Sequence, residues 1–121
     1  MTDEDAIRST IAEYAHLADD GRFEEWAELY VEDGDLDIGG EVLHGREALA
    51  AFMRGSSTVG STTRIFAVPD VRVDGDHATS VGNFLVVSND MQPVSAGRVY
   101  DEWVRDPDRW RLRFRRIVLK G

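Results

Sequence analysis

The chain has 121 residues, 42% of them hydrophobic, with no cysteine and a formal net charge of −9, which fits one globular domain and excludes disulfides, thiolate metal sites and a thiol nucleophile. No apolar run approaches the roughly 20 residues that a membrane span needs. The acidic start MTDEDAIRST also lacks the basic and apolar regions of a signal peptide. We therefore expect one cytoplasmic domain over residues 1–121, without a membrane partner.

The first predicted element is an amphipathic helix over roughly residues 3–19, which Gly21 ends. On a wheel of about 100° per residue, its apolar stripe faces inward and Asp19 lies at the flank of that stripe. His16 and Asp20 point away, so we expect an exposed histidine and a solvated turn or capping aspartate. The inward stripe consists of Ile7, Ile11, Tyr14, Ala15 and Ala18.

Two short helices and two short strands follow. The stretches DLDI and EVL, on either side of Gly39 and Gly40, are strand candidates. The stretch REALAAFMR predicts a third helix with Leu49, Phe52 and Met53 inward and Gly55 as its end. The second helix, which precedes these elements, carries an aromatic face at helical spacing: Phe23, Trp26, Ala27 and Tyr30.

The second half of the chain predicts a sheet. The small polar stretch at residues 55–63 is a loop suited to covering the mouth of a pocket. Pro69 interrupts the first strand candidate, which is therefore expected to be bulged or at an edge. Helices followed by antiparallel strands indicate an α+β domain. The strand candidates are residues 62–74, 77–89, 94–105 and 109–119.

The last strand is rich in arginine. Residues 98–121 carry eight basic and four acidic side chains, against six and nineteen in residues 1–97. In RWRLRFRR, however, Arg111, Arg113 and Arg115 alternate with Trp110, Leu112 and Phe114. This alternation indicates a sheet with one polar face, and we expect no nucleic-acid partner because the acidic remainder repels phosphates. Arg116 breaks the alternation, which indicates either a bulge or an inward cation; we favour the bulge.

No metal or cofactor is expected. Asp33, Asp35 and Asp37 occupy the first, third and fifth positions of a calcium loop, but Ile38 and His44 stand where that loop needs glycine and glutamate. The three histidines show no metal-binding spacing. The chain also contains no glycine-rich phosphate loop and no nucleophilic serine motif.

Three segments together resemble one known superfamily: YAHLADDGRFEEWAELYVEDGDLDI, then HGREAL, then GRVYDEWVRDPDRWRLRFRRI. They are similar to the nuclear-transport-factor-2-like superfamily, particularly its SnoaL-like members, over nearly the whole chain. The resemblance implies a cone-shaped curved antiparallel sheet wrapped around about three N-terminal helices. It also implies an apolar cavity inside the cone and a homodimer, which we expect to form through the outer face of the sheet. Relatives include polyketide cyclases, scytalone dehydratase, ketosteroid isomerase and proteins that only bind ligands.

The resemblance gives roles to two residues of the first helix. Asp19 matches the acid–base aspartate of scytalone dehydratase, and Tyr14 matches the tyrosine of ketosteroid isomerase that hydrogen-bonds a developing oxyanion. A carboxylate at the edge of an apolar cavity is desolvated, which brings its pKa toward that of a useful base. The residues by themselves leave two simpler roles open: Asp19 bonded to nearby backbone amides, and Tyr14 packed in the core.

Other positions depart from those relatives. Ile38 stands where ketosteroid isomerase has its catalytic aspartate, and Arg64 and Asn83 match the two histidines of scytalone dehydratase. Arg64 either binds an anion or enolate or pairs with Asp19. Asn83 makes either a structural bond or a ligand contact. Which face of the strand at 94–105 lines the cavity, that of Tyr100 or that of Asp101, stays open because a bulge would exchange them.

The leading hypothesis is a cofactor-independent lyase, isomerase or cyclase that acts by acid–base chemistry on a small hydrophobic, polyketide-like or ring-like molecule. Asp19 would transfer a proton and Tyr14 would stabilise the oxyanion. The alternative is a non-catalytic module that binds a small molecule or a partner chain, which the missing histidines favour; a non-catalytic oxygenase subunit is a third possibility. The expected substrate-binding residues are Arg64, Asn83, Tyr100, Trp26, Ile38 and Phe52.

Overall fold

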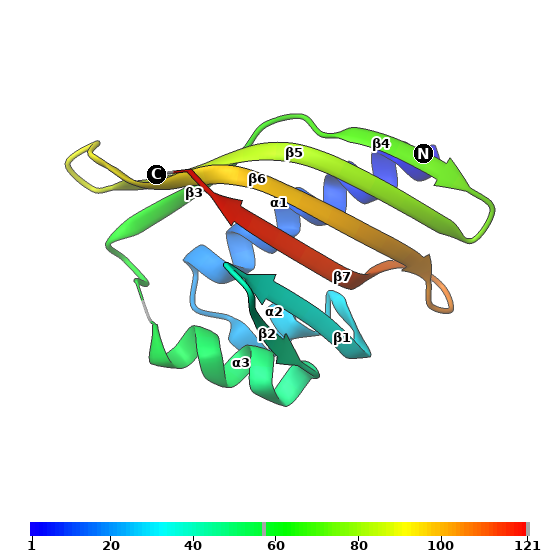
Figure 1. Ribbon diagram of the computed structural model, residues 1–121, viewed down its shortest axis with the longest axis horizontal. Helices are drawn as coiled ribbons and strands as arrows, with labels where there is room; N and C mark the ends of the chain where they lie inside the picture. The colour runs from blue at the N-terminus through cyan, green and yellow to red at the C-terminus, as the bar shows by residue number, and fades with distance from the viewer. Residues whose placement is uncertain (57, 121) are drawn as a thin grey trace.

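The computed structural model describes residues 1–56 and 58–120, and its elements follow the order expected of the α+β domain (Figure 1). The helices are α1 (Asp3–Asp19), α2 (Phe23–Ala27) and α3 (Arg46–Gly55). The strands are β1 (Tyr30–Ile38), β2 (Glu41–His44), β3 (Thr62–Phe66), β4 (Asp70–Asp74), β5 (His77–Ser88), β6 (Pro93–Arg105) and β7 (Trp110–Leu119).

Both ends of α1 are fixed by local chemistry. The Thr2 hydroxyl accepts a hydrogen bond from the backbone N–H of Asp5 at 3.1 Å and so caps the first turn. At the other end Gly21 adopts a φ of 74°, and the N–H of Arg22 reaches back to the carbonyl of Leu17 at 3.0 Å. Asp20 is an exposed residue of this turn, whereas Arg22 occupies the N-cap position of α2.

The strands form one curved sheet in the order β2-β1-β7-β6-β5-β3, with β4 also paired to β5. All these pairs are antiparallel except β1 with β7, so the expected antiparallel sheet is in fact mixed. A parallel pair needs a long connection, and here the whole of α3 and the later hairpins separate the two strands. The single strand expected at residues 62–74 is also two strands, β3 and β4, on either side of Pro69.

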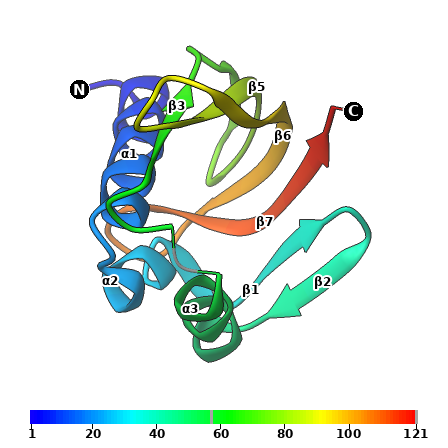
Figure 2. The same cartoon turned by 90° about the vertical axis from the view of Figure 1, so that its left-hand side faces the viewer.

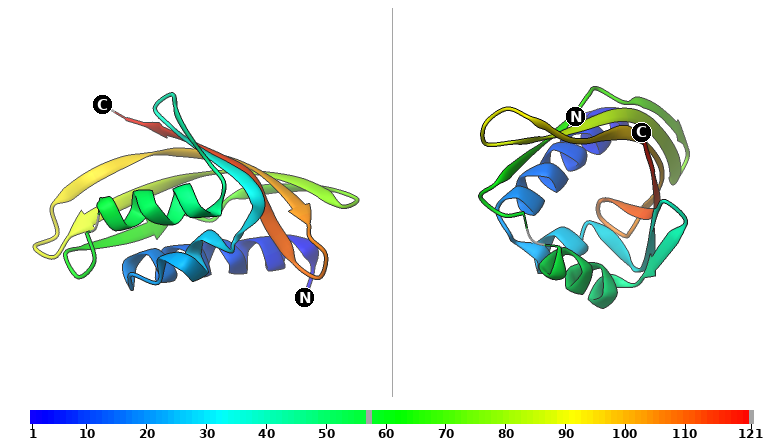
Figure 3. Two further views of the ribbon diagram at one scale, coloured as in Figure 1. Left: turned by 90° about the horizontal axis from the view of Figure 1, so that it is seen from below. Right: turned by 60° about the vertical axis from the view of Figure 1, so that its left-hand side comes forward.

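The sheet curves around the helices without closing into a barrel (Figures 2 and 3). α1 packs against β3 and β4, whereas α3 packs against α2 and β1. Burying a large apolar side chain contributes about 1.5–3 kcal/mol to folding, so the side chains packed between sheet and helices are a main source of the domain's stability. The largest apolar side chains that are fully buried there are Trp26, Trp103, Tyr30, Ile7, Leu36, Leu49 and Leu112.

A bulge in β7 decides which arginine faces inward. Glu102 of β6 pairs with Phe114, but the next residue of β6 pairs with Leu112, so β7 accommodates extra chain at this point. Beyond the bulge the alternation is shifted: Arg115 is fully buried, whereas Arg116 is exposed. The bulge predicted from Arg116 is confirmed, but the expectation that Arg115 faces outward is wrong.

On β6 the inward face is the one that carries Asp101, which is 3% exposed, and the outward face carries Tyr100, which is 41% exposed. None of the described helices is both long and apolar enough to span a bilayer.

Candidate ligand-binding cavity

A cavity of about 250 Å³ lies between the helices and the inner face of the sheet. Its walls come from inward positions of β1, β3, β5, β6 and β7 and from one face of each helix, and they are mainly aliphatic and aromatic. The cavity reaches the surface near the end of β7, because Leu119 lines it and is 51% exposed. The arrangement suits a small apolar molecule.

The structure brings five of the residues expected to form the site to the lining of this cavity. They are Tyr14 of α1, Trp26 of α2, Ile38 of β1, Phe52 of α3 and Arg64 of β3. Besides α1, two helices and two strands therefore contribute to the lining. The contributing residues are far apart in the chain, with fifty positions between Tyr14 and Arg64.

Asn83 and Tyr100 lie elsewhere. Both occupy outward positions of neighbouring strands, on the face of the sheet turned away from the helices. The side-chain oxygen of Asn83 accepts a hydrogen bond from Nε of Arg98 at 3.2 Å. Of the two roles left open for Asn83, the structure thus shows the structural bond. Neither Asn83 nor Tyr100 lines the cavity.

Asp19 contacts the cavity wall through Arg64. Its carboxylate accepts a hydrogen bond from Nη1 of Arg64 at 2.9 Å and another from the backbone N–H of the same residue at 3.1 Å. The two side chains are 18% and 20% exposed, so this ion pair is mostly shielded from water. Asp19 itself is not among the residues that line the cavity. Asp19 thus makes both a hydrogen bond to a backbone amide and an ion pair with a side chain, and both partners belong to Arg64.

Tyr14 forms a buried hydroxyl pair with Tyr30, whose oxygen lies 3.1 Å away. Burial is the main reason why the pKa of Tyr30 is raised well above its ordinary value, so Tyr30 stays a phenol at neutral pH. Arg46 of α3 fixes the start of β1 here, since its Nε and Nη2 donate to the carbonyl oxygen of Tyr30 at 3.0 and 2.8 Å. The Tyr14 ring also packs against Trp26, with centroids 5.2 Å apart.

Tyr30 was not predicted from the sequence to be part of this site. Its spacing from Phe23 placed it on the aromatic face of the second helix, but α2 ends at Ala27 and Tyr30 begins β1.

A buried ion pair lies behind Tyr14. Arg115 donates from Nε and Nη2 to the carboxylate of Asp101 at 2.7 and 2.9 Å, and both side chains are at most 1% exposed. Ser80 donates to the same carboxylate at 3.0 Å and accepts from the indole of Trp103 at 2.8 Å. Burial opposes the charge of Arg115, but the nearby carboxylate and tyrosines outweigh it and raise the pKa of Arg115.

This ion pair was not predicted from the sequence, because the bulge turns Arg115 inward. One signal was present: Asp101 shares a strand face with Val99 and Trp103, and a carboxylate on an apolar face requires a buried partner.

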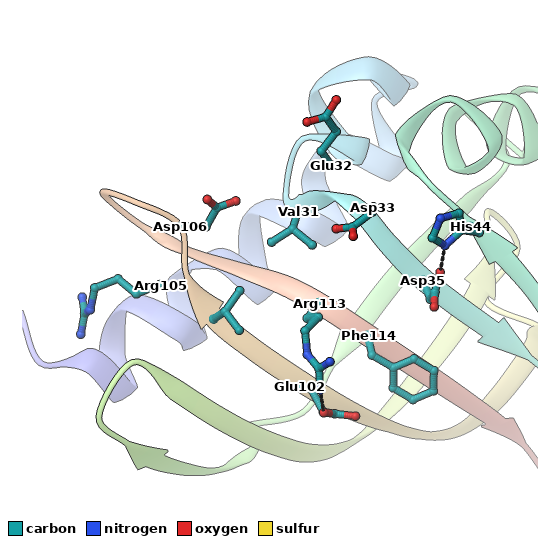
Figure 4. Close-up of a pocket in the computed structure, with 11 residues that line it drawn as sticks. Val31, Glu32, Asp33, Asp35, His44, Glu102, Arg105, Asp106, Arg113 and Phe114 are labelled. Atoms are coloured by element: carbon teal, nitrogen blue, oxygen red, sulfur yellow. Dashed lines mark hydrogen bonds and ion pairs between the residues drawn. The ribbon is translucent and has the colours of Figure 1, made fainter.

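A second hollow, of about 680 Å³, lies on the outer side of the sheet where β1 departs from β7 (Figure 4). Four of its charged groups form two pairs with each other, Asp35 with His44 and Glu102 with Arg113, and Arg105 pairs with Asp3 and Asp76. The hollow is open and polar, so it does not suit an apolar ligand. Across the described part of the chain, no group of three or more His, Asp or Glu side chains is placed to hold a metal ion.

Comparisons with known proteins agree with this architecture. The family model for the SnoaL-like domain matches residues 1–116. An NTF2-like protein with a cystatin-like fold from Novosphingobium aromaticivorans is 32% identical, with a TM-score of 0.87 over 97% of this chain and 81% of that chain. No curated protein matches the sequence.

Two more distant structures show the fold alone. A protein of unknown function from Mycobacterium tuberculosis is 24% identical, with a TM-score of 0.89 over 95% of this chain and 70% of that chain. ActVI-ORFA from Streptomyces coelicolor is 19% identical, with a TM-score of 0.84 over 95% of each chain. Together with the helices, the curved sheet and the cavity, the match over residues 1–116 identifies the chain as a member of the SnoaL-like domain family.

Proposed function

We propose that this chain binds a small hydrophobic molecule in the cavity between its helices and its sheet. The observation that carries the proposal is the lining: aliphatic and aromatic side chains from every layer of the fold surround a space of about 250 Å³, with few polar groups among them. Pockets of this composition bind apolar molecules through burial and orient them through the few polar groups.

The test is binding of 2-naphthamide, a neutral bicyclic probe, measured by isothermal titration calorimetry. Ile117 lines the cavity and Val118, its neighbour on β7, faces outward and is 48% exposed. Ile117→Phe fills the cavity and should abolish binding, whereas Val118→Phe adds a comparable ring outside it and should leave binding unchanged. Equal effects of the two variants would contradict the proposal, as would failure of the wild-type protein to bind both naphthamide and the corresponding carboxylate, 2-naphthoate.

A second candidate function is acid–base catalysis on such a molecule: a dehydration, cyclisation or isomerisation. It is favoured by the Tyr14 phenol, which lies in the cavity wall, and by the link from that wall to Asp19 through Arg64. Tyr14 would donate a hydrogen bond to a developing enolate oxygen. Asp19, which lies beside Arg64 and outside the lining, would turn toward the cavity and accept the proton that leaves the neighbouring carbon.

Proton exchange tests this candidate without knowledge of the natural substrate. 1-Tetralone in D2O exchanges the protons beside its carbonyl through an enolate, and NMR follows their loss. The catalytic candidate requires faster exchange with the protein than in buffer, and Asp19→Asn and Tyr14→Phe should both reduce the rate. A rate equal to that of the buffer, with tetralone bound, would leave binding as the function.

We also propose that two copies associate through the outer face of the sheet. Exposed apolar side chains there include Val81 at 36%, Tyr100 at 41% and Val118 at 48%. They lie on adjacent strands, since Val81 is the cross-strand partner of Tyr100 and Val118 is that of Arg98. These apolar side chains lie beside Asn83, Arg98 and Arg116 on the same face. Such a mixed patch of exposed apolar and polar side chains on a sheet face is suited to packing against a second copy of itself.

A further inference from the structure

Resting on the proposed function, we infer that the ligand of the cavity is an amphipathic organic anion, with an apolar body and one carboxylate-like group that Arg64 binds. Among the described residues that line the cavity, Arg64 carries the one charged side chain, and no acidic side chain lines it. A single cation in an apolar wall selects a ligand with a single anionic group, because a charge transferred there without a partner is strongly destabilised.

The guanidinium of Arg64 is held in place by Asp19, but only some of its N–H donors have hydrogen-bond partners. Asp19 accepts from its Nη1 and from the backbone N–H of the same residue, which fixes the side chain against α1. Within the described chain, Nε and Nη2 of Arg64 have no hydrogen-bond partner. These two atoms form the edge that binds a carboxylate through two parallel hydrogen bonds.

Arg115 shows the same edge in use. There Nε and Nη2 donate to the two carboxylate oxygens of Asp101 at 2.7 and 2.9 Å. The geometry that a ligand carboxylate would adopt on Arg64 is therefore one that this protein already forms in its core.

Arg64 also borders another hollow, whose lining contains no acidic residue. This third hollow, of about 260 Å³, lies between α1 and the connection from β3 to β4, and Arg64 and Phe66 line it. Its other basic residues are Arg8 and His16, and its remaining lining residues are apolar. In a chain of net charge −9, neither hollow at Arg64 is lined by a carboxylate; the acidic side chain bonded to Arg64 is Asp19, which lines neither of them.

The inference is tested with two probes that share one ring system, 2-naphthoate and the neutral 2-naphthamide, titrated at pH 7. We expect naphthoate to bind about tenfold more tightly, the effect of one charge-assisted hydrogen-bonded pair. Arg64→Gln should lower the affinity for naphthoate to that for naphthamide and change the affinity for naphthamide by less than about twofold. The matched control is Arg72→Gln, which removes the same charge from a side chain that is 80% exposed.

A second measurement does not depend on the variant's stability. In the wild-type protein, the NMR signal of the Arg64 Nε–H should shift on addition of naphthoate and not on addition of naphthamide. Where Arg64→Gln is unstable because it leaves Asp19 unpaired, the double variant Asp19→Asn/Arg64→Gln replaces it. Equal binding of the two probes, or an equal loss in the Arg64 and Arg72 variants, would overturn this inference and leave the cavity as a binding site. Absence of binding by both probes would instead overturn the proposed function.

Discussion

The guanidinium carbon of Arg115 lies 4.2 Å from the centre of the Tyr14 ring, so a buried ion pair supports the wall of the cavity. The same guanidinium lies 5.2 Å from the ring centre of Phe66, which also lines the cavity. Cation–π contacts of this kind hold aromatic rings in defined orientations. The shape of the cavity wall therefore depends on a charged side chain that does not itself line the cavity.

The first prediction concerns that charge. Arg115→Met leaves Asp101 buried without its partner, which should reduce the free energy of unfolding by about 3–5 kcal/mol. Urea unfolding followed by circular dichroism measures the loss. The double variant Arg115→Met/Asp101→Leu removes both charges and should be distinctly more stable than the single variant. A loss below about 1 kcal/mol for Arg115→Met would show that Asp101 finds other solvation.

The second prediction concerns pH. The phenol of Tyr30 has its pKa raised by burial, so above pH 10 the unfolded chain releases this proton while the folded chain keeps it. The unfolded state then binds fewer protons, and stability falls with pH by up to about 1.4 kcal/mol per pH unit. Below pH 10 this group contributes no pH dependence. Tyr30→Phe should therefore show a smaller loss of unfolding free energy between pH 9 and 11 than the wild type; equal slopes would contradict the burial of Tyr30.

Much of the fold was predictable because its signals are local. The helix at residues 3–19 was predicted with the ends it has, since Gly21 and the periodic stripe that contains Ile7 and Ile11 define it. Tyr14, Trp26 and Phe52 reached the cavity lining because helical spacing reports which side of a helix is buried.

The strands were harder because a bulge cannot be located from alternation. In β7 the extra residue at Arg113 and Phe114 exchanged the two faces, which turned Arg115 inward. Asn83 and Tyr100 lay on the outer face for a related reason: alternation groups residues by face but does not say which face meets the helices. The parallel pairing of β1 with β7 joins distant segments, and no local pattern encodes it.

A third prediction concerns the cap of α1. Gly21 has a φ of 74°, and a Cβ placed there would meet the Val59 side chain at 3.1 Å. Gly21→Ala should therefore cost about 1 kcal/mol of unfolding free energy, measured by urea titration. Gly55, at the end of α3, has an ordinary φ and open space around the added atom, so Gly55→Ala is the matched control and should be neutral or slightly stabilising. Equal losses in both variants would show that the left-handed turn is not what the glycine provides.

The last prediction concerns association of two copies through the outer face of the sheet. Tyr100 lies between its cross-strand partners Val81 and Arg116 on that face. Tyr100→Glu removes the ring from the middle of this patch and places a hydrated carboxylate where the two copies would meet, and removing a charge from water is unfavourable, so the dimer should dissociate. Light scattering coupled to gel filtration should report a dimer for the wild type and a monomer for the variant. Val68→Glu, at a side chain that is 84% exposed on the connection from β3 to β4, is the control and should remain dimeric. A monomeric wild type, or dissociation of both variants, would contradict association through this face.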